Sequence, residues 1–222
     1  MNTIDYTTKH LNLWKQQLGK IPEYVWNLTQ LETLVLADNG LSEVSEKIGT
    51  LTNLRTLDLG HNELSSLPET ICNLVNLTDF LYLHDNKLVD LPDAIGNLRR
   101  LRYLNLSQNA FTALPRPVCE LVGLIELRLT DDHLSSLPDA IGSLANLREL
   151  HLRNNELQTL PDSIGRLEPL RQLDLRGNPL TELPPSILDL PRLEKLDLRW
   201  VTSLSTSAIL EELEERGCIV YR

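Results

Sequence analysis

Aromatic and basic side chains are both scarce in this sequence. Aromatic residues make up 5% of the 222 residues, whereas hydrophobic residues of all kinds make up 41%, so a core must be built from aliphatic side chains. Lys and Arg number 21 against 31 Asp and Glu, which gives a net charge of −10. Because duplex binding requires basic side chains that displace counterions from phosphates, we expect neither nucleic acid nor an anionic membrane as a partner.

Long apolar runs and paired cysteines are also missing. No stretch approaches the ~18 apolar residues of a membrane span, and residues 1–20 hold no uninterrupted apolar run of the signal-peptide type. An odd and small number of cysteines, three, does not suggest a disulfide framework. We therefore expect a cytoplasmic protein, with a secreted effector that lacks a conventional signal peptide as the alternative.

One 23-residue phrase recurs along almost the whole chain. Residues 54–76 and 147–169 both follow L-x-x-L-x-L-x-x-N-x-L-x-x-L-P-x-x-I-x-x-L-x-x. The alternation in L-x-L predicts a short strand with leucines on one face, and successive strands should stack in parallel ~4.8 Å apart. Stacked units then share one core that no unit could form alone. Repeats begin at Leu31, Leu54, Leu77, Leu101, Leu124, Leu147, Leu170 and Leu193, after a less regular unit from Thr8.

Fixed polar and turn residues follow each strand. An asparagine turns the chain, and its amide can satisfy backbone donors and acceptors, so stacked copies should form a ladder. Asp132 takes this position in one unit and can only accept hydrogen bonds when ionised. The next Leu-Pro pair predicts a short helix or 3₁₀ turn, which Ser45 in place of proline should loosen. A crowded backbone is expected at Gly49, Gly96, Gly142 and Gly165.

The repeated L-P-x-x-I-G-x-L phrase resembles the leucine-rich-repeat superfamily over residues 8–203. It is most similar to the 23-residue intracellular type of Ras-pathway scaffold proteins, plant intracellular Ras-group-related proteins and many bacterial proteins. The resemblance implies an α/β fold, a right-handed horseshoe solenoid. A parallel sheet would line its concave face, and short helices, 3₁₀ turns or loops its convex face. It also implies a protein-binding role for the concave face.

We expect a single leucine-rich-repeat domain over residues 1–222. Residues 1–30 would form an N-terminal unit and cap, with residues 1–7 as the cap itself, and residues 31–203 the repeats. Residues 204–222 would form a C-terminal helical cap with a short edge strand. Its helix should run over residues 208–216, with Ser205 or Ser207 as the N-cap and Gly217 at its end. The edge strand should cover residues 218–221.

The third repeat contains one extra residue before Leu81. We expect a bulge or a looser lead into this strand. We favour a tolerated insertion with Phe80 packed in the core. The alternative is an outward-pointing Phe80 beside a binding site.

Side chains between and just after the strand leucines should face the concave surface. Tyr82 and Tyr103 are neighbours there, near His61 and His84, and exposed tyrosines of this kind anchor partners. An arginine run follows towards the C-terminus. Asp174 is expected to neutralise Arg176 on the same strand, as is Asp197 for Arg199. The candidate partner-binding residues are Trp14, His61, Tyr82, His84, Tyr103, Arg128, His151, Arg153, Arg176 and Arg199.

Two of the arginines and the terminal tryptophans differ from the rest. Arg153 has His151 rather than an acid beside it, so Arg128 and Arg153 are the better candidates for a partner's carboxylate. Trp14 and Trp200 lie at opposite ends of the repeats. Each is either a cap that covers the core or an exposed contact.

No catalytic or cofactor motif accompanies the repeats. A metal site around His61 and His84 is conceivable, but no third ligand is fixed by spacing, so we expect none. Phosphate loops, dinucleotide fingerprints and nucleophile elbows are missing, and we expect neither an enzyme nor a cofactor. We predict a monomeric protein–protein interaction module, such as a signalling adaptor. A bacterial effector delivered into a host cell and a glycan-binding surface formed by Tyr82, Tyr103 and Trp14 are the alternatives.

Overall fold

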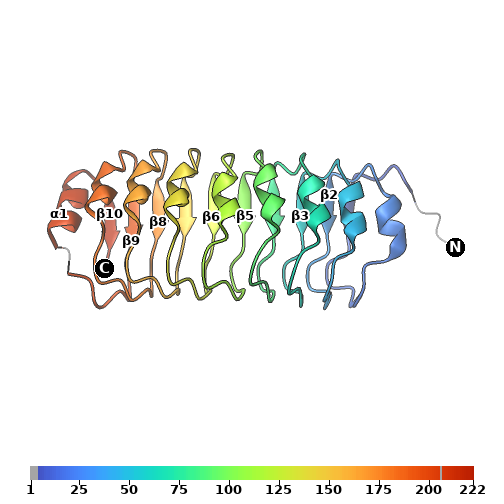
Figure 1. The fold of residues 1–222 in the computed structure, drawn as a ribbon, viewed down its shortest axis with the longest axis horizontal. Coiled ribbons are helices and arrows are strands. Elements are labelled where there is room, and N and C mark those ends of the chain that lie inside the picture. The colour runs from blue at the N-terminus through green and yellow to red at the C-terminus, as the bar shows by residue number, and fades with distance from the viewer. Residues whose placement is uncertain (1–4, 206) are drawn as a thin grey trace.

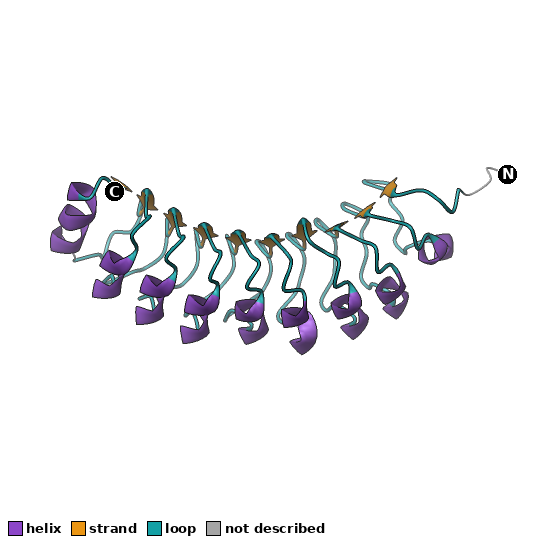
Figure 2. Ribbon diagram, turned by 90° about the horizontal axis from the view of Figure 1, so that it is seen from above, coloured by secondary structure: helices purple, strands orange, loops and turns teal. Residues whose placement is uncertain are grey.

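The repeats from β1 to β8 each contribute one short strand and one 3₁₀ helix. In the computed structural model, which describes residues 5–205 and 207–222, the units stack side by side into a solenoid (Figure 1). The solenoid is curved (Figure 2). The strands line its inner, concave side and the helices its outer, convex side (Figure 2). Ten strands form one parallel sheet in sequence order. The predicted solenoid, with a concave sheet and convex 3₁₀ turns, is confirmed.

The elements alternate regularly along the chain. The strands are β1 (His10–Asn12), β2 (Thr33–Val35), β3 (Thr56–Asp58), β4 (Phe80–Tyr82), β5 (Tyr103–Asn105), β6 (Glu126–Arg128), β7 (Glu149–His151), β8 (Gln172–Asp174), β9 (Lys195–Asp197) and β10 (Ile219–Tyr221). The 3₁₀ helices are η1 (Glu23–Asn27), η2 (Glu46–Thr50), η3 (Glu69–Asn73), η4 (Asp93–Asn97), η5 (Arg116–Glu120), η6 (Asp139–Ser143), η7 (Asp162–Arg166) and η8 (Pro185–Asp189). An α-helix, α1 (Ser207–Glu215), lies between β9 and β10.

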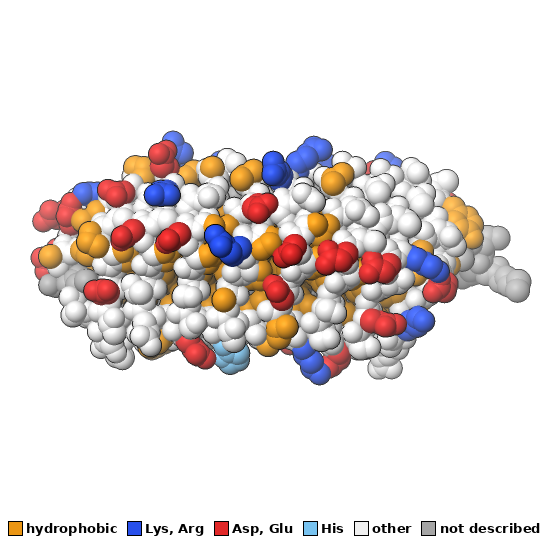
Figure 3. Space-filling model, viewed as in Figure 1, with side chains coloured by type: hydrophobic (Ala, Val, Ile, Leu, Met, Phe, Trp, Pro, Cys, Tyr) orange, Lys and Arg blue, Asp and Glu red, His pale blue; other side chains and the backbone are white. Residues whose placement is uncertain are grey.

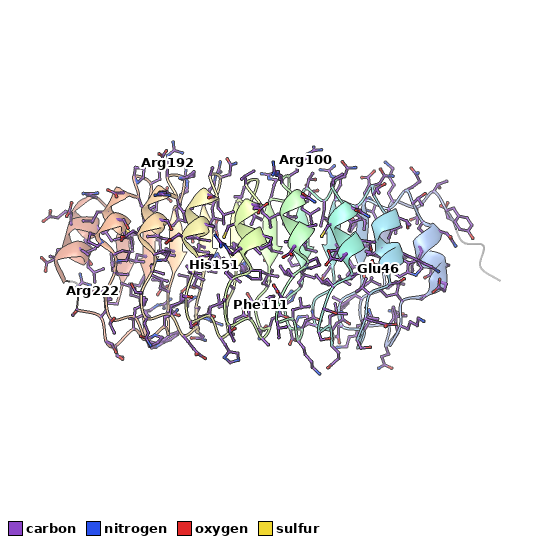
Figure 4. All side chains as sticks on the ribbon, viewed as in Figure 1. Glu46, Arg100, Phe111, His151, Arg192 and Arg222 are labelled. Carbon is purple, nitrogen blue, oxygen red and sulfur yellow. The ribbon has the colours of Figure 1, made fainter. Side chains whose placement is uncertain are left out.

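Leucine columns along the solenoid form the core. The middle leucines of β2 to β9 lie in register with those of their neighbours, as Leu104 does with Leu81 and Leu127. These side chains are buried. Burial of a leucine side chain contributes about 2 kcal/mol, which an isolated short strand could not gain. Phe111, labelled in Figure 4, occupies a leucine position in one unit and is also fully buried.

The predicted asparagine ladder is present between successive units. Asn62, for example, donates from Nδ2 to the carbonyls of Leu36 (3.1 Å) and Leu59 (3.0 Å). Its Oδ1 accepts the N–H of Leu41 at 3.0 Å. One amide therefore satisfies backbone groups of two adjacent coils. The other ladder residues are Asn39, Asn86, Asn109, Asn155 and Asn178.

Asp132 interrupts this ladder because a carboxylate cannot donate. Its Oδ1 accepts the N–H of Asn109 at 2.8 Å, but its buried Oδ2 has no hydrogen-bond partner among the described residues. In the next unit, the equivalent Nδ2 of Asn155 donates to the carbonyls of Leu129 and Leu152. By the same repeat spacing, Oδ2 of Asp132 faces the carbonyls of Leu106 and Leu129, which are acceptors like itself. Burial raises the pKa of Asp132 to about 7. The protonated acid, which can donate, therefore fits this position best.

The convex turns are tighter than the sequence suggests at one position. Ser45 does not loosen its turn, because its Oγ accepts the N–H of Lys47 at 3.3 Å and the backbone keeps the conformation of the prolines elsewhere.

The convex side is crowded and charged. Gly49 confirms the expected crowding, since an added Cβ would lie 2.7 Å from Thr70 Cβ. Figure 3 shows acidic side chains along this face, with basic side chains among them. Six of the 3₁₀ helices carry an acid in the first turn, namely Glu23, Glu46, Glu69, Asp93, Asp139 and Asp162, whereas η5 begins with Arg116.

The extra residue of the third repeat does not bulge its strand. β4 keeps its register with β3 and β5, and the insertion is taken up before the strand, where Arg102 N–H bonds Thr78 O at 3.2 Å. The favoured expectation that Phe80 packs in the core is wrong. Phe80 is 42% exposed. Because the extra residue is accommodated before the strand, Leu81 still points inward and Phe80, the residue before it, points outward.

The C-terminal cap has the expected parts with shifted boundaries. α1 buries Leu210 and Leu213 against the last repeat, and β10 pairs with β9. Gly217, at φ +88°, ends the helix, and the N–H of Cys218 bonds Leu213 O at 3.0 Å. α1 begins at Ser207, one residue earlier than expected, and the predicted cap at Ser205 or Ser207 adjoins residue 206, which is not described. Residue 206 and the N-terminal cap residues 1–4 lie outside the described residues.

Candidate functional site

Three aromatic side chains meet on the concave face. Tyr82 and Tyr103 come from adjacent strands, with ring centroids 5.1 Å apart. Phe80 lies 5.8 Å from Tyr82 and 5.4 Å from Tyr103, also between ring centroids. We call these three residues the aromatic cluster. The sequence predicts the tyrosine pair, but it does not reveal Phe80, whose orientation depends on where the inserted residue is accommodated.

The aromatic cluster borders a shallow hollow of about 320 Å³. Phe80 and Tyr103 form its aromatic side, and Ile125 and Glu126 lie opposite. Burial raises the pKa of Tyr103 to about 12, and burial followed by the nearby Asp58 carboxylate raises that of Tyr82. Both hydroxyls therefore stay protonated at neutral pH, so they can donate a hydrogen bond while their rings contact an apolar group.

The two predicted histidines extend the aromatic cluster towards the N-terminus. His84 Nε2 lies 3.2 Å from His61 Nε2, and His61 Nδ1 lies 2.5 Å from Asp85 Oδ2. His84 also packs edge-on against Tyr82, at 6.0 Å between ring centroids. Burial, followed by the charge of His61, lowers the pKa of His84. Within the described part of the chain, no third side chain completes a metal-ligand set with this pair.

The C-terminal arginines are already paired with acids. Arg176 forms two hydrogen bonds with Asp174, at 2.8 and 2.6 Å. Arg199 does the same with Asp197, at 2.9 and 2.8 Å. The expected self-neutralising ladder is confirmed. These arginines present polar edges and little net positive charge.

Arg128 and Arg153, the expected candidates for a partner's carboxylate, are also paired with acids of this chain. Arg128 Nε lies 2.6 Å from Glu126 Oε1, two residues earlier on the same strand. This i, i+2 spacing equals that of the other pairs, so the sequence contained the signal. Arg153 instead pairs with Asp131 of the preceding coil, at 2.8 Å, which only the stacking of coils brings within reach.

Four of the remaining candidates share one hollow of about 270 Å³ over β6 to β9. Arg128, His151, Arg153 and Arg176 line it, together with Asp174 and Asp197. Trp14 and Trp200 are 56% and 66% exposed, so neither covers the core. His151 lies on strand β7, behind the 3₁₀ helices in the view of Figure 4. No helix among the residues that the structure describes is long and apolar enough to cross a bilayer.

Comparisons with known proteins agree with this architecture. A family profile described as a leucine-rich repeat region matches residues 9–100, 74–154 and 138–219. A leucine-rich-repeat protein of Leptospira interrogans aligns with a TM-score of 0.90 and 36% identity, covering 98% of this chain and 55% of that protein. The leucine-rich repeat domain of the type III effector XopL aligns with a TM-score of 0.79 and 26% identity, over 97% of this chain and 77% of that domain.

A plant receptor provides a third comparison. The Arabidopsis receptor kinase HAESA, in complex with the peptide hormone IDA and the co-receptor SERK1, aligns with a TM-score of 0.73 and 29% identity. The alignment covers 90% of this chain and 37% of the receptor. The chain thus spans 55% of the Leptospira protein and a smaller share of the receptor. A search among curated protein sequences finds no significant match.

Proposed function

Because the chain belongs to the leucine-rich repeat family, we propose that it is a protein-interaction module that binds a protein or peptide on its concave face. The aromatic cluster is the observation that carries this proposal. Large apolar side chains that stay exposed on a folded protein mark contact sites, and tyrosine is enriched among residues that dominate binding energy. The described repeats belong to a family that is usually non-catalytic.

The cluster is preformed, which favours binding. Its rings pack against one another on a sheet whose strands are joined by hydrogen bonds, for example from Leu83 N–H to Asn105 O at 2.9 Å. A partner would therefore order few side chains of this protein. We propose an extended peptide segment with an apolar or aromatic residue for the hollow beside Phe80. The structure of HAESA with a peptide hormone supports this class of partner.

The polar candidates would surround this centre. Arginines already held by acids are oriented but neutralised, so they contribute specificity more than net attraction. We therefore propose the aromatic cluster with His61 and His84 as the centre of the site. Arg128, His151, Arg153, Arg176 and Arg199 would form its polar side, and Trp14 would contact only a long partner.

Peptide selection provides a direct test. Peptides selected from a displayed random library on the wild-type protein should bind a Tyr82→Ala/Tyr103→Ala variant at least tenfold more weakly, since an anchor residue contributes about 1–2 kcal/mol or more. Trp200→Ala, which removes an exposed aromatic residue outside the cluster, should leave the dissociation constant unchanged. Calorimetry measures both, and circular dichroism verifies that the variants are folded.

Two results would contradict the proposal. Equal peptide affinity in the wild type and the double variant would place the site elsewhere. Binding to a glycan array that is lost in Tyr82→Ala, without peptide binding, would identify the surface as a glycan-binding one.

We further propose that residues 1–222 act as one domain, of the 23-residue intracellular type, and that the protein is a cytoplasmic signalling adaptor. One hydrophobic core extends from Ile21 to Cys218, which supports a single domain. The similarity to the effector XopL supports the alternative of a bacterial effector delivered into a host cell. Detection of the chain in host cytosol during infection would favour that alternative, and its retention in the producing cell would favour the adaptor.

A further inference from the structure

Two glutamates lie side by side on the concave face, next to the aromatic cluster. Glu126 of β6 and Glu149 of β7 are direct neighbours in the parallel register. Like charges at such positions repel and require a compensating cation. Arg128 neutralises Glu126. Among the described residues, Glu149 has no Lys or Arg within ion-pair distance, and its basic neighbour is His151.

The imidazole of His151 lies between these carboxylates without bonding normally to either. Its Nε2 is 3.4 Å from Glu149 Oε2 and 3.6 Å from Glu126 Oε1, both longer than the usual 2.7–3.2 Å of an N–H···O hydrogen bond. This nitrogen is buried and has no hydrogen-bond partner among the described residues. One donor atom from each of the three residues lies within 4.8 Å of the others.

The two separations from His151 Nε2 fit the edges of a metal-coordination tetrahedron. Zinc bonds of about 2.0–2.1 Å to nitrogen and carboxylate oxygen place neighbouring ligand atoms about 3.3–3.4 Å apart in tetrahedral geometry. The two separations from His151 Nε2 exceed that value by no more than about 0.3 Å, which side-chain rotations can close. One imidazole and two carboxylates are also among the usual ligands of zinc.

We propose that Glu126, Glu149 and His151 form a zinc-binding site on the concave face, with the fourth coordination position open towards solvent or a partner's side chain. The site differs from the His61–His84 pair, which the sequence makes conceivable as a metal site but does not favour. It also does not depend on the aromatic cluster being the peptide site.

One neighbouring side chain competes with a metal ion for this site. Arg128 occupies Glu126 Oε1 at 2.6 Å and would have to share or leave this oxygen. Its guanidinium already lies 5.9 Å from the Tyr103 ring centroid, where it could stay by a cation–π contact.

Zinc binding to the tag-free full chain tests the proposal. Competition with a chromophoric chelator should give one zinc per chain with a dissociation constant in about the micromolar range. His151→Ala and Glu149→Gln should each weaken binding at least tenfold. His133→Ala is the matched control, because His133 pairs with Glu156 at 3.2 Å on the surface without a third ligand, and it should bind zinc like the wild type.

Cobalt(II) provides a second measurement that does not depend on the variants. In place of zinc it should give the intense visible absorption of a tetrahedral site, which His151→Ala should abolish. Zinc affinity that is equal in the wild type, His151→Ala and Glu149→Gln would overturn the proposal. The absence of stoichiometric zinc binding, or only the weak spectrum of the hydrated cobalt ion, would also overturn it.

Discussion

Replacing Asp132 by asparagine should stabilise this protein, and the gain should grow with pH. Asparagine would restore the ladder by donating from Nδ2 to carbonyls that now face an oxygen without a partner. It would also remove an acid whose ionised form is disfavoured by burial. The substitution changes one atom of the side chain and its hydrogens, so it creates neither a cavity nor a clash.

The shift in the pKa of Asp132 determines how large the stabilisation by Asp132→Asn should be. The carboxyl has a pKa of about 7 in the folded protein against 3.8 for the exposed group. Because the folded-state pKa is the higher one, the contribution to stability is complete below pH 4 and is lost as the pH rises to about 7 and above. Relative to low pH, this difference of about three pKa units lowers the free energy of unfolding by about 4 kcal/mol at pH 8 and by about 2 kcal/mol at pH 5.5. Asp132→Asn should recover this loss.

Urea unfolding of both proteins at pH 8 and pH 5.5 measures the effect. The free energy of unfolding of Asp132→Asn should exceed that of the wild type by about 2–4 kcal/mol at pH 8, and this excess should be smaller by about 2 kcal/mol at pH 5.5. An advantage that is absent at pH 8, or equal at both pH values, would refute the reasoning.

The neighbouring Asp131 is a matched control with the opposite sign. Partial burial alone would raise its pKa, but hydrogen bonds from Asn154 and Arg153 lower it overall. Asp131→Asn should therefore be neutral or destabilising at pH 8. A stabilisation as large as that of Asp132→Asn would point to net charge rather than to the ladder.

Two further predictions concern packing. Leu150→Ala, at a fully buried strand position, should lower the free energy of unfolding by about 2–5 kcal/mol. Val89→Ala, at an exposed position, should change it by less than about 0.5 kcal/mol. Similar urea midpoints for the two variants would contradict the core assignment. Gly49→Ala should cost about 1–3 kcal/mol, because the new Cβ would lie 2.7 Å from Thr70 Cβ; an unchanged thermal midpoint would show that η3 can move away.

The candidate site was only partly predictable. Tyr82, Tyr103 and His84 follow from strand alternation, because every second residue of a strand points to the same face. His61 follows from its position in the repeat, just after the strand. Phe80 could not be assigned, since the inserted residue could have shifted either the strand or its lead-in. The pairing of Arg153 with Asp131 joins neighbouring coils, and sequence spacing alone does not specify how a long side chain bridges them.

The cluster of Glu126, Glu149 and His151 was missed for a similar reason. Glu149 and His151 are two residues apart on one strand, but Glu126 lies one repeat earlier, and sequence gives no distance between side-chain atoms of different coils. His151 was assigned to the concave face correctly. Its isolation from hydrogen-bond partners, which makes the cluster a candidate zinc site, is a property of packing.

The sequence by itself determined the solenoid, its register and its ladder, because a 23-residue period forces equivalent side chains into equivalent places. Only the tertiary structure decided which concave side chains touch. Those contacts depend on the rotamers of long side chains and on an insertion of one residue, neither of which a periodic pattern specifies. The repeat therefore dictates the backbone, and the departures from the repeat decide the chemistry of the surface.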